Sequence, residues 1–207
     1  YAADGYNLRD DWYGSDIRDV SSRHKRLSEE AILSSVESTD FLQAVTMLYT
    51  LEKRKADIAT GKTGKQISPV SAKRASVLEL PLSAYQHWAG SVEKGFNCAA
   101  KFLRQECFTT PRELPYRTQL APLAAVMAKI CSKDNERWRE PQIHQKLARW
   151  FWCGVLGELY GGAVETRIAN DVEELLAWIE GNGDLPRTIN DANFQIDRLS
   201  SLASRLS

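Results

Sequence analysis

The stretch ADIATGKT, residues 56–63, is where this sequence comes nearest to a nucleotide-binding motif. It reads A-x-x-x-x-G-K-T and lacks only the first glycine of the phosphate-binding loop G-x-x-x-x-G-K-[ST], whose amides and lysine hold phosphates. Such a loop leaves a buried strand and enters a helix. Here the preceding VTMLYTLEKRK has a helical pattern, and the following GKQISPV contains Pro69 and no helix start. We therefore interpret the match as a coincidence within a basic loop at 56–71.

Basic side chains gather around this loop. Between residues 53 and 74 the chain carries seven basic side chains and one acidic one, a local charge of +6. The seven are Lys53, Arg54, Lys55, Lys62, Lys65, Lys73 and Arg74. Such a cluster could contact DNA phosphates, with an affinity that falls steeply as salt is raised. The alternative is a solvated loop, because the segment has no aromatic side chain on which a base could stack.

A second candidate site lies in the acidic stretch from residue 158 to residue 184, which has seven carboxylates and one arginine. On an unbroken helix, Glu158 and Glu165 would share a face and could bind a metal or act as an acid–base pair beside Arg167. Two adjacent glycines between them are expected to break that helix, and Arg149 and Arg167 are available as ion-pair partners. We therefore expect a buried or half-buried ion-pair network, with no metal site and no catalytic residue.

Composition narrows the class of protein. The 207 residues contain 27 basic and 27 acidic side chains, so net charge gives no general attraction to nucleic acid or membrane. The longest apolar run, Trp150 to Gly157, is far shorter than the roughly 20 residues that span a bilayer. The four cysteines form no C-x-x-C pair and have no histidine at zinc-ligand spacing. We expect reduced thiols, a cytoplasmic location and no membrane partner.

The elements that must position these residues are helical almost throughout. Apolar residues recur at i, i+3, i+4 and i+7 after Asp40, an expected N-cap, and again after Ser83. Thr110 and Glu113 have the spacing of a capping box. No run alternates as a half-buried strand would. We predict an all-α fold, an irregular bundle of about seven helices without a sheet, whose last helix begins after Asn190.

We expect residues 1–207 to form a single helical domain. The sequence opens at Tyr1 within what reads as domain sequence, and it stops inside the amphipathic FQIDRLSSLASRLS. From both ends we expect the chain to be a fragment of a larger multidomain protein.

Several segments of the sequence resemble segments of a known protein family. They are YAADGYNLR at the start, STDFLQAVTML at 38–48, LPYRTQLAPLAA at 114–125, KLARWFWCGVLGELYGGAVETR at 146–167 and DANF at 191–194. Together they resemble the region between the two catalytic domains of GmrSD-type restriction endonucleases, which cleave modified DNA. The polar residues of the matching words are Tyr116, Arg117, Gln119, Arg149, Glu158, Tyr160, Glu165 and Arg167.

The resemblance implies a helical connecting or scaffold region within a nucleotide-dependent endonuclease that acts in phage defence. In that family a ParB/sulfiredoxin-like N-terminal domain with an Asp-Gly-Gln-Gln-Arg motif hydrolyses nucleotide, and a C-terminal His-Asn-His (HNH) domain cuts DNA. Neither motif occurs in this sequence, so none of the family's catalytic residues carries over. Nucleotide and divalent metal are implied only for the flanking nucleotide-hydrolysing and nuclease domains, which would be the partners of this chain.

Two alternatives to the scaffold role stay open at this point. One is a helical DNA-binding module that uses the basic segment 53–74. The other is a metal-assisted hydrolytic role for Glu158, Glu165 and Arg167.

Overall fold

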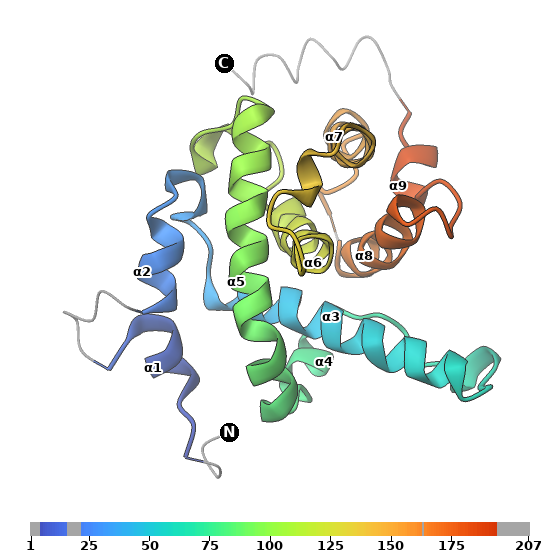
Figure 1. The fold of residues 1–207 in the computed structure, drawn as a ribbon, viewed down its shortest axis with the longest axis horizontal. Coiled ribbons are helices and arrows are strands. Elements are labelled where there is room, and N and C mark those ends of the chain that lie inside the picture. The colour runs from blue at the N-terminus through green and yellow to red at the C-terminus, as the bar shows by residue number, and fades with distance from the viewer. Residues whose placement is uncertain (1–4, 16–21, 163, 194–207) are drawn as a thin grey trace.

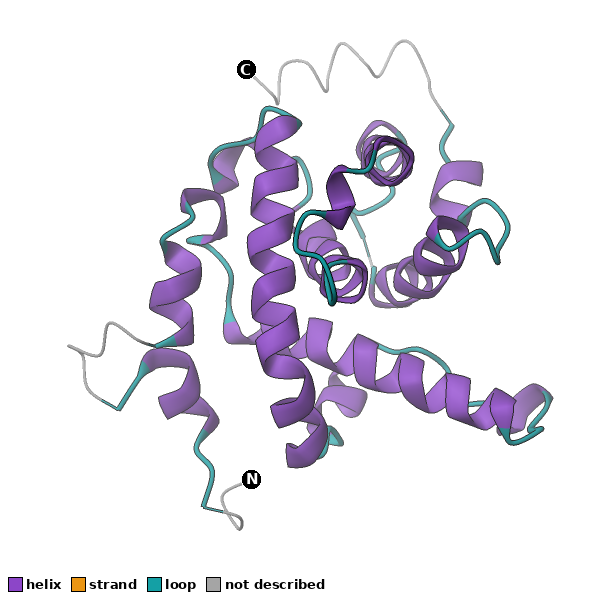
Figure 2. Cartoon of the chain, viewed as in Figure 1, coloured by secondary structure: helices purple, strands orange, loops and turns teal. Residues whose placement is uncertain are grey.

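The computed structural model describes residues 5–15, 22–162 and 164–193 of the chain. This part consists of helices and loops without a strand (Figure 2), so the predicted all-α fold is confirmed. The helices are α1 (Leu8–Tyr13), α2 (Arg23–Ser28), α3 (Ser38–Ala59), α4 (Arg74–Leu78), α5 (Leu82–Gln105), α6 (Leu120–Ile130), α7 (Pro141–Leu156), α8 (Glu165–Ile179) and α9 (Arg187–Asn190).

The described residues thus form nine α-helices, where the sequence predicts about seven. The additional helices are short: α1 and α2 have six residues each and α9 has four. A helix of one or two turns is too short to show a 3.6-residue repeat, which is why periodicity misses it. The helix predicted to begin after Asn190 falls largely on residues 194–207, outside the described part.

Helix α6 forms the centre of the bundle. Ten of its eleven residues are buried, and the helix is apolar on every side, as a helix surrounded by others must be. Helices α5, α3 and α8 pack around it, and α1 and α2 lie on the far side of α5 (Figure 1). At Gly95 on α5 an added Cβ would lie 2.2 Å from the carbonyl oxygen of Ala124, so the two backbones touch there.

Helix α3 is half core and half arm. Eight of its residues from Phe41 to Leu51 are buried, whereas after Leu51 only Asp57 is buried. Its C-terminal half therefore extends beyond the helices that cover its beginning (Figure 1). The basic segment begins on this arm.

Two of the predicted helix starts need correction. Helix α3 begins before Asp40: Glu37 is the N-cap, and the Glu37 amide donates to the Asp40 carboxylate over 2.9 Å in a reciprocal capping box. Helix α5 begins at Leu82, with Pro81 rather than Ser83 at the N-cap. The capping box of Thr110 and Glu113 is confirmed, on a single 3₁₀ turn.

The break between α7 and α8 comes earlier than the two adjacent glycines predict. Helix α7 ends at Leu156, and Glu158 takes the left-handed conformation with φ 54°. The turn brings Tyr160 back against α7: a Cβ on Gly154 would lie 2.5 Å from both the Tyr160 ring and the Gln119 amide nitrogen. Glycine is required there because those side chains occupy the space.

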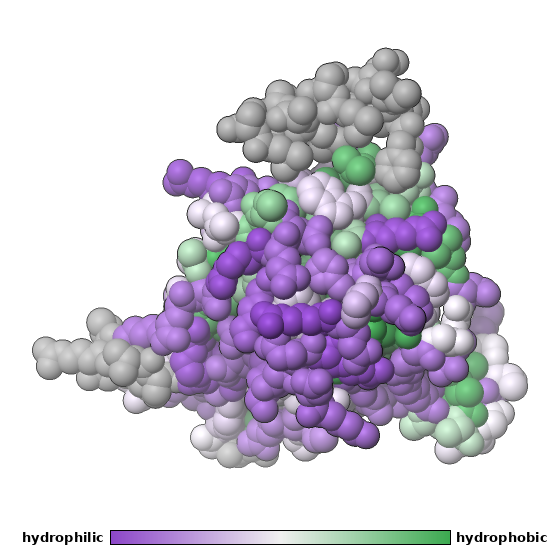
Figure 3. Space-filling view, turned by 45° about the horizontal axis from the view of Figure 1, so that its top comes forward, coloured by the Kyte–Doolittle hydropathy of each residue, from purple (hydrophilic) through white to green (hydrophobic). Residues whose placement is uncertain are grey.

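Hydrophobic side chains from Trp12 to Ile189 form one buried cluster. On the face shown in Figure 3, hydrophilic side chains cover most of the surface and hydrophobic ones appear in small separate groups. No helix in the described part of the chain is both long and apolar enough to cross a membrane.

Candidate functional site

Asp57 closes the loop that resembles a phosphate-binding motif. Its carboxylate accepts a hydrogen bond from Lys62 Nζ over 2.6 Å and another from the Ser68 amide over 2.8 Å. The hydrogen bond from Lys62 has the largest effect on the Asp57 carboxyl, and together with the bond from Ser68 it holds the pKa well below its usual range. Lys62, the lysine of the G-K-T motif, is therefore paired within its own loop, and this loop follows a helix rather than a strand.

The loop is shorter than the predicted 56–71, because α3 continues to Ala59 and a 3₁₀ turn occupies Gly64–Gln66.

Arg54, on the last turns of α3, has a partner on another helix. Its Nε lies 2.5 Å from Oε1 of Glu173 on α8. Arg54 and Lys62 thus hold the arm to α8 and close its tip, so they are structural parts of the basic segment.

The other five basic residues of the segment are accessible to solvent. All five are exposed, and none has an ion pair within the ranges that the structure describes. They are Lys53, Lys55, Lys65, Lys73 and Arg74.

Two of these lysines line a cleft between α3, the extended segment 68–73, α4 and the start of α8. Its volume is about 420 Å³. Glu165 and Asn170 of α8 line it together with Lys53 and Lys73. The remaining lining residues are Tyr49, Thr50, Ser68, Pro69, Val70, Ser71, Ser76, Glu79, Thr166 and Ala169. The cleft thus joins the basic segment to the acidic stretch, two regions that the sequence predicts as separate candidate sites.

We call this feature the α3–α8 cleft. It carries four charged side chains: Lys53, Lys73, Glu79 and Glu165. All four are exposed, and none is in an ion pair or side-chain hydrogen bond with another described residue. Its charges are therefore balanced in number and free to meet a ligand.

Most other residues of the family-matching polar set lie outside the cleft and contact neighbouring elements. Tyr160 and Thr188 both donate hydrogen bonds to the buried carboxylate of Asp171, the latter over 2.6 Å. Arg167 extends this network: its Nη1 donates to Thr188 Oγ over 3.2 Å, and its Nη2 lies 3.2 Å from Asp191. These contacts join the turn after α7 to α8 and α9.

Burial has the largest effect on the pKa values of Asp171 and Tyr160, which connect the turn after α7 to α8. Asp171 is 1% exposed, and desolvation raises the pKa of its carboxyl, although the hydrogen bonds from Thr188 and Tyr160 act in the opposite direction. Burial likewise raises the pKa of Tyr160 well above its usual range, helped by the nearby Asp171. Tyr160 therefore stays a donor at neutral pH.

Three further members of the set support the neighbouring helices. Arg117 Nη2 lies 2.5 Å from the Asp40 carboxylate, and so reaches the start of α3. Gln119 is 1% exposed, and its Nε2 donates to the carbonyl of Phe151 over 3.2 Å. Tyr116 packs against Tyr160, with ring centroids 6.4 Å apart.

The two glutamates proposed as a pair do not lie on one helix. Glu158 is in the turn after α7, and Glu165 is the first residue of α8. The expected partner Arg167 instead contacts Asp191 and Thr188, and Arg149 is exposed. Among the described residues, no group of three or more His, Cys, Asp or Glu is placed to hold a metal ion.

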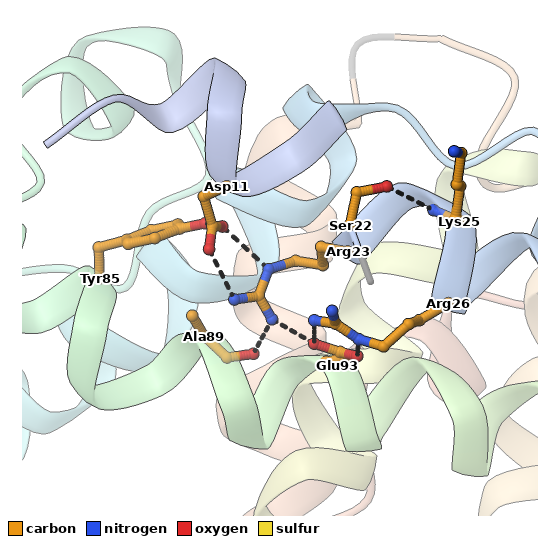
Figure 4. A network of polar contacts seen from close by, with 8 residues as sticks. All are labelled: Asp11, Ser22, Arg23, Lys25, Arg26, Tyr85, Ala89 and Glu93. Atoms are coloured by element: carbon orange, nitrogen blue, oxygen red, sulfur yellow. Dashed lines mark hydrogen bonds and ion pairs between the residues drawn. The ribbon is translucent and has the colours of Figure 1, made fainter. Parts of the chain in front are cut away.

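Another charged cluster, not foreseen from the sequence, joins α1, α2 and α5. The Arg23 guanidinium lies between Asp11 and Glu93 (Figure 4), with its Nε 3.0 Å from Asp11. Arg26 makes two hydrogen bonds to the same Glu93, over 2.6 and 2.9 Å. Tyr85 donates its hydroxyl hydrogen to Asp11. No local motif could reveal this set, because its members come from three helices.

We call these five residues the Arg23 network. Arg23 is 8% exposed, and its guanidinium also stacks 4.9 Å from the ring centre of Phe41. Partial burial acts to raise the pKa of Asp11, but the hydrogen bonds from Arg23 and Tyr85 and the charge of Arg23 lower it on balance.

No family model matches the chain, and no solved structure matches it. A segment of 51 residues is 31% identical to the uncharacterized protein MJ0686 of Methanocaldococcus jannaschii. The similarity covers 25% of this chain and 9% of that protein.

Proposed function

We propose that this chain is the helical scaffold region of a GmrSD-like, nucleotide-dependent DNA restriction endonuclease that acts in the cytoplasm. In this role it connects a nucleotide-hydrolysing module to a nuclease module and makes or breaks no bonds itself. One observation carries the proposal: polar residues of the family-matching words are used to join helices. Arg117, Gln119, Tyr160 and Arg167 each contact a residue on another element.

Contacts of this kind can pass a displacement of one helix to its neighbours. Tyr160 and Arg167 reach α8 and α9 through Asp171 and Thr188, while Arg117 reaches the start of α3. A displacement at α9 is therefore connected by hydrogen bonds to α8, which is itself paired with α3 through Glu173 and Arg54. Rigid helices and polar joints of this kind can couple two sites.

The gene provides the first test. We expect a domain with the Asp-Gly-Gln-Gln-Arg motif and a His-Asn-His nuclease in the same reading frame or an adjacent one. The protein provides the second test: with nucleotide, magnesium or manganese and modified DNA, the isolated chain should show no turnover, and the complete system should show both activities. Hydrolysis by the isolated chain, or a gene without the two modules, would contradict the proposal.

The second candidate function is binding of DNA phosphates by the basic segment. It is favoured by Lys55 on the projecting arm and Lys65 on the 3₁₀ turn after it, both exposed and without ion-pair partners in the described part of the chain. Arg54 and Lys62 are already paired, so the footprint is smaller than the seven residues predicted.

A gel-shift titration at several salt concentrations tests this function. Each phosphate contact should contribute about 0.9 to the slope of log affinity against log salt, so five contacts should give a steep dependence. The variant Lys55→Ala/Lys65→Ala should lower the slope by about 2, whereas Lys133→Ala, which removes an exposed lysine outside the basic segment, should not change it. Binding that is insensitive to salt would rule the footprint out.

A further inference from the structure

We propose that the α3–α8 cleft binds the phosphate ester of a sugar, either a sugar phosphate or a mononucleotide. In this arrangement Lys53 and Lys73 hold the phosphate, and Glu79 and Glu165 accept hydrogen bonds from sugar hydroxyls. The cleft volume of about 420 Å³ lies within the usual range for small-molecule sites.

The balance of charges selects this class of ligand. Two carboxylates offset the two ammonium groups, so a bare phosphate ion would gain little from entering the cleft. A ligand with an anionic end and a hydroxyl-bearing body uses all four side chains, because a carboxylate is a strong acceptor for hydroxyl hydrogens. None of the four has a competing partner among the described residues.

One wall of the cleft is already fixed in place. The amide of Ser71 donates to Thr50 Oγ over 3.1 Å, and the amide of Lys73 donates to Ser71 Oγ over 3.2 Å. Ser76 donates to the same Ser71 hydroxyl over 2.8 Å. A wall held by such bonds loses little conformational freedom when a ligand enters, and this lowers the cost of binding.

Other residues of the cleft offer groups suited to the body of the ligand. Thr166 and Asn170 of α8 have side chains without hydrogen-bond partners in the described ranges, so both can donate and accept. Half-buried Tyr49 presents an aromatic ring on which a sugar or base can pack. Comparing a sugar phosphate with a mononucleotide, which also carries a base, shows which of the two the cleft prefers.

Calorimetric titration of the full chain tests the proposal, with ribose 5-phosphate, adenosine monophosphate, ribose, inorganic phosphate and a short oligonucleotide as probes. At least one of the two phosphate esters should bind, about tenfold or more tightly than ribose or inorganic phosphate. The variant Lys53→Ala/Lys73→Ala should lose about tenfold or more in affinity, as expected for the loss of charge-assisted bonds. Glu165→Gln should reduce the preference over inorganic phosphate.

Lys133→Ala is the matched control, because this lysine is exposed and does not line the cleft. Its affinity should equal that of the unmodified chain. The proposal fails if neither ester binds, if inorganic phosphate binds as tightly as both, or if the Lys53/Lys73 variant retains full affinity. It also fails if only the oligonucleotide binds, a result that would support the DNA-binding function. Failure on any of these grounds leaves the scaffold role untouched.

Discussion

The Arg23 network and the α3–α8 cleft contain similar charged groups arranged in opposite ways. In the network, Arg23 and Arg26 are paired with Asp11 and Glu93 at the joint of three helices. In the cleft, two lysines and two glutamates face a common space without pairing.

Burial explains this difference. A charge removed from water must be paired, because its desolvation is otherwise uncompensated. Charges that remain hydrated need no partner and are available to a ligand. A network of satisfied charges therefore indicates structure, whereas unpaired charges that converge on a cleft indicate binding.

The largest expected effect is on the Arg23 network. Replacing Arg23 by alanine leaves Asp11 and Glu93 without their shared partner, and it should lower the free energy of unfolding by about 3–5 kcal/mol. Urea denaturation measures this change. Arg26→Ala is the control: its side chain is 41% exposed, and it should cost less than about 1 kcal/mol. Equal costs would show that burial does not distinguish the two arginines.

A smaller effect should appear in the dependence of stability on pH. The folded-state pKa of Asp11 is lowered, so its contribution is present above the usual value of 3.8 and is lost as pH falls below it. The folded-state pKa of Asp171 is raised, so stability should fall as pH rises above 3.8 and this buried carboxyl ionises.

The variants Asp11→Asn and Asp171→Asn separate these opposite trends. In urea denaturation between about pH 3 and pH 7, the advantage of the unmodified chain over Asp11→Asn should grow with pH. Its advantage over Asp171→Asn should shrink across the same range. If the two differences change in the same direction, one of the two assignments is wrong.

The cleft should contribute little to folding. Lys53→Ala/Lys73→Ala and Glu165→Gln remove exposed groups without partners, so each variant should change the free energy of unfolding by less than about 0.5 kcal/mol. Thermal and urea denaturation measure this. A loss above about 1 kcal/mol would mean that the cleft charges are structural, and the contrast with the Arg23 network would disappear.

The smallest effect is expected at Lys62, which belongs to the exposed basic segment but is paired with Asp57. Lys62→Gln removes the 2.6 Å ion pair to Asp57 but leaves the Ser68 amide bond in place. Hydrogen exchange of the Ser68 amide should become faster while the helices keep their protection, because only the loop is loosened. Unchanged exchange would mean that Lys62 does not hold the loop.

Much of the fold could be predicted from the sequence, because its signals are local. Apolar spacing identifies the long helices, and the Thr110–Glu113 capping box is read directly from two residues. The phosphate-loop resemblance could be set aside for the same reason, since a helix precedes it. Short helices such as α1 and α2 escaped because one or two turns contain no period.

The sites could be predicted only in part, because they depend on distant residues meeting. The basic segment was identified, but not the pairing of Arg54 with Glu173, which is 119 residues away. The cleft joins Tyr49 to Asn170, and no spacing rule relates these positions. Asp171 was visible as one carboxylate of the acidic stretch, but its partner Thr188 carried no signal of its own.

The most direct test of the proposed scaffold role is the effect of Arg167→Ala on nucleotide hydrolysis and DNA cleavage by the complete endonuclease that the proposal implies. Arg167 lies at the joint of α8 and α9. If this joint transmits position, the variant should hydrolyse nucleotide at nearly the unmodified rate and cleave modified DNA about tenfold more slowly, within the usual range for residues along a coupling network. Lys133→Ala should leave both activities unchanged. Unchanged cleavage by Arg167→Ala, or equal losses of both activities, would contradict a scaffold that couples the two modules.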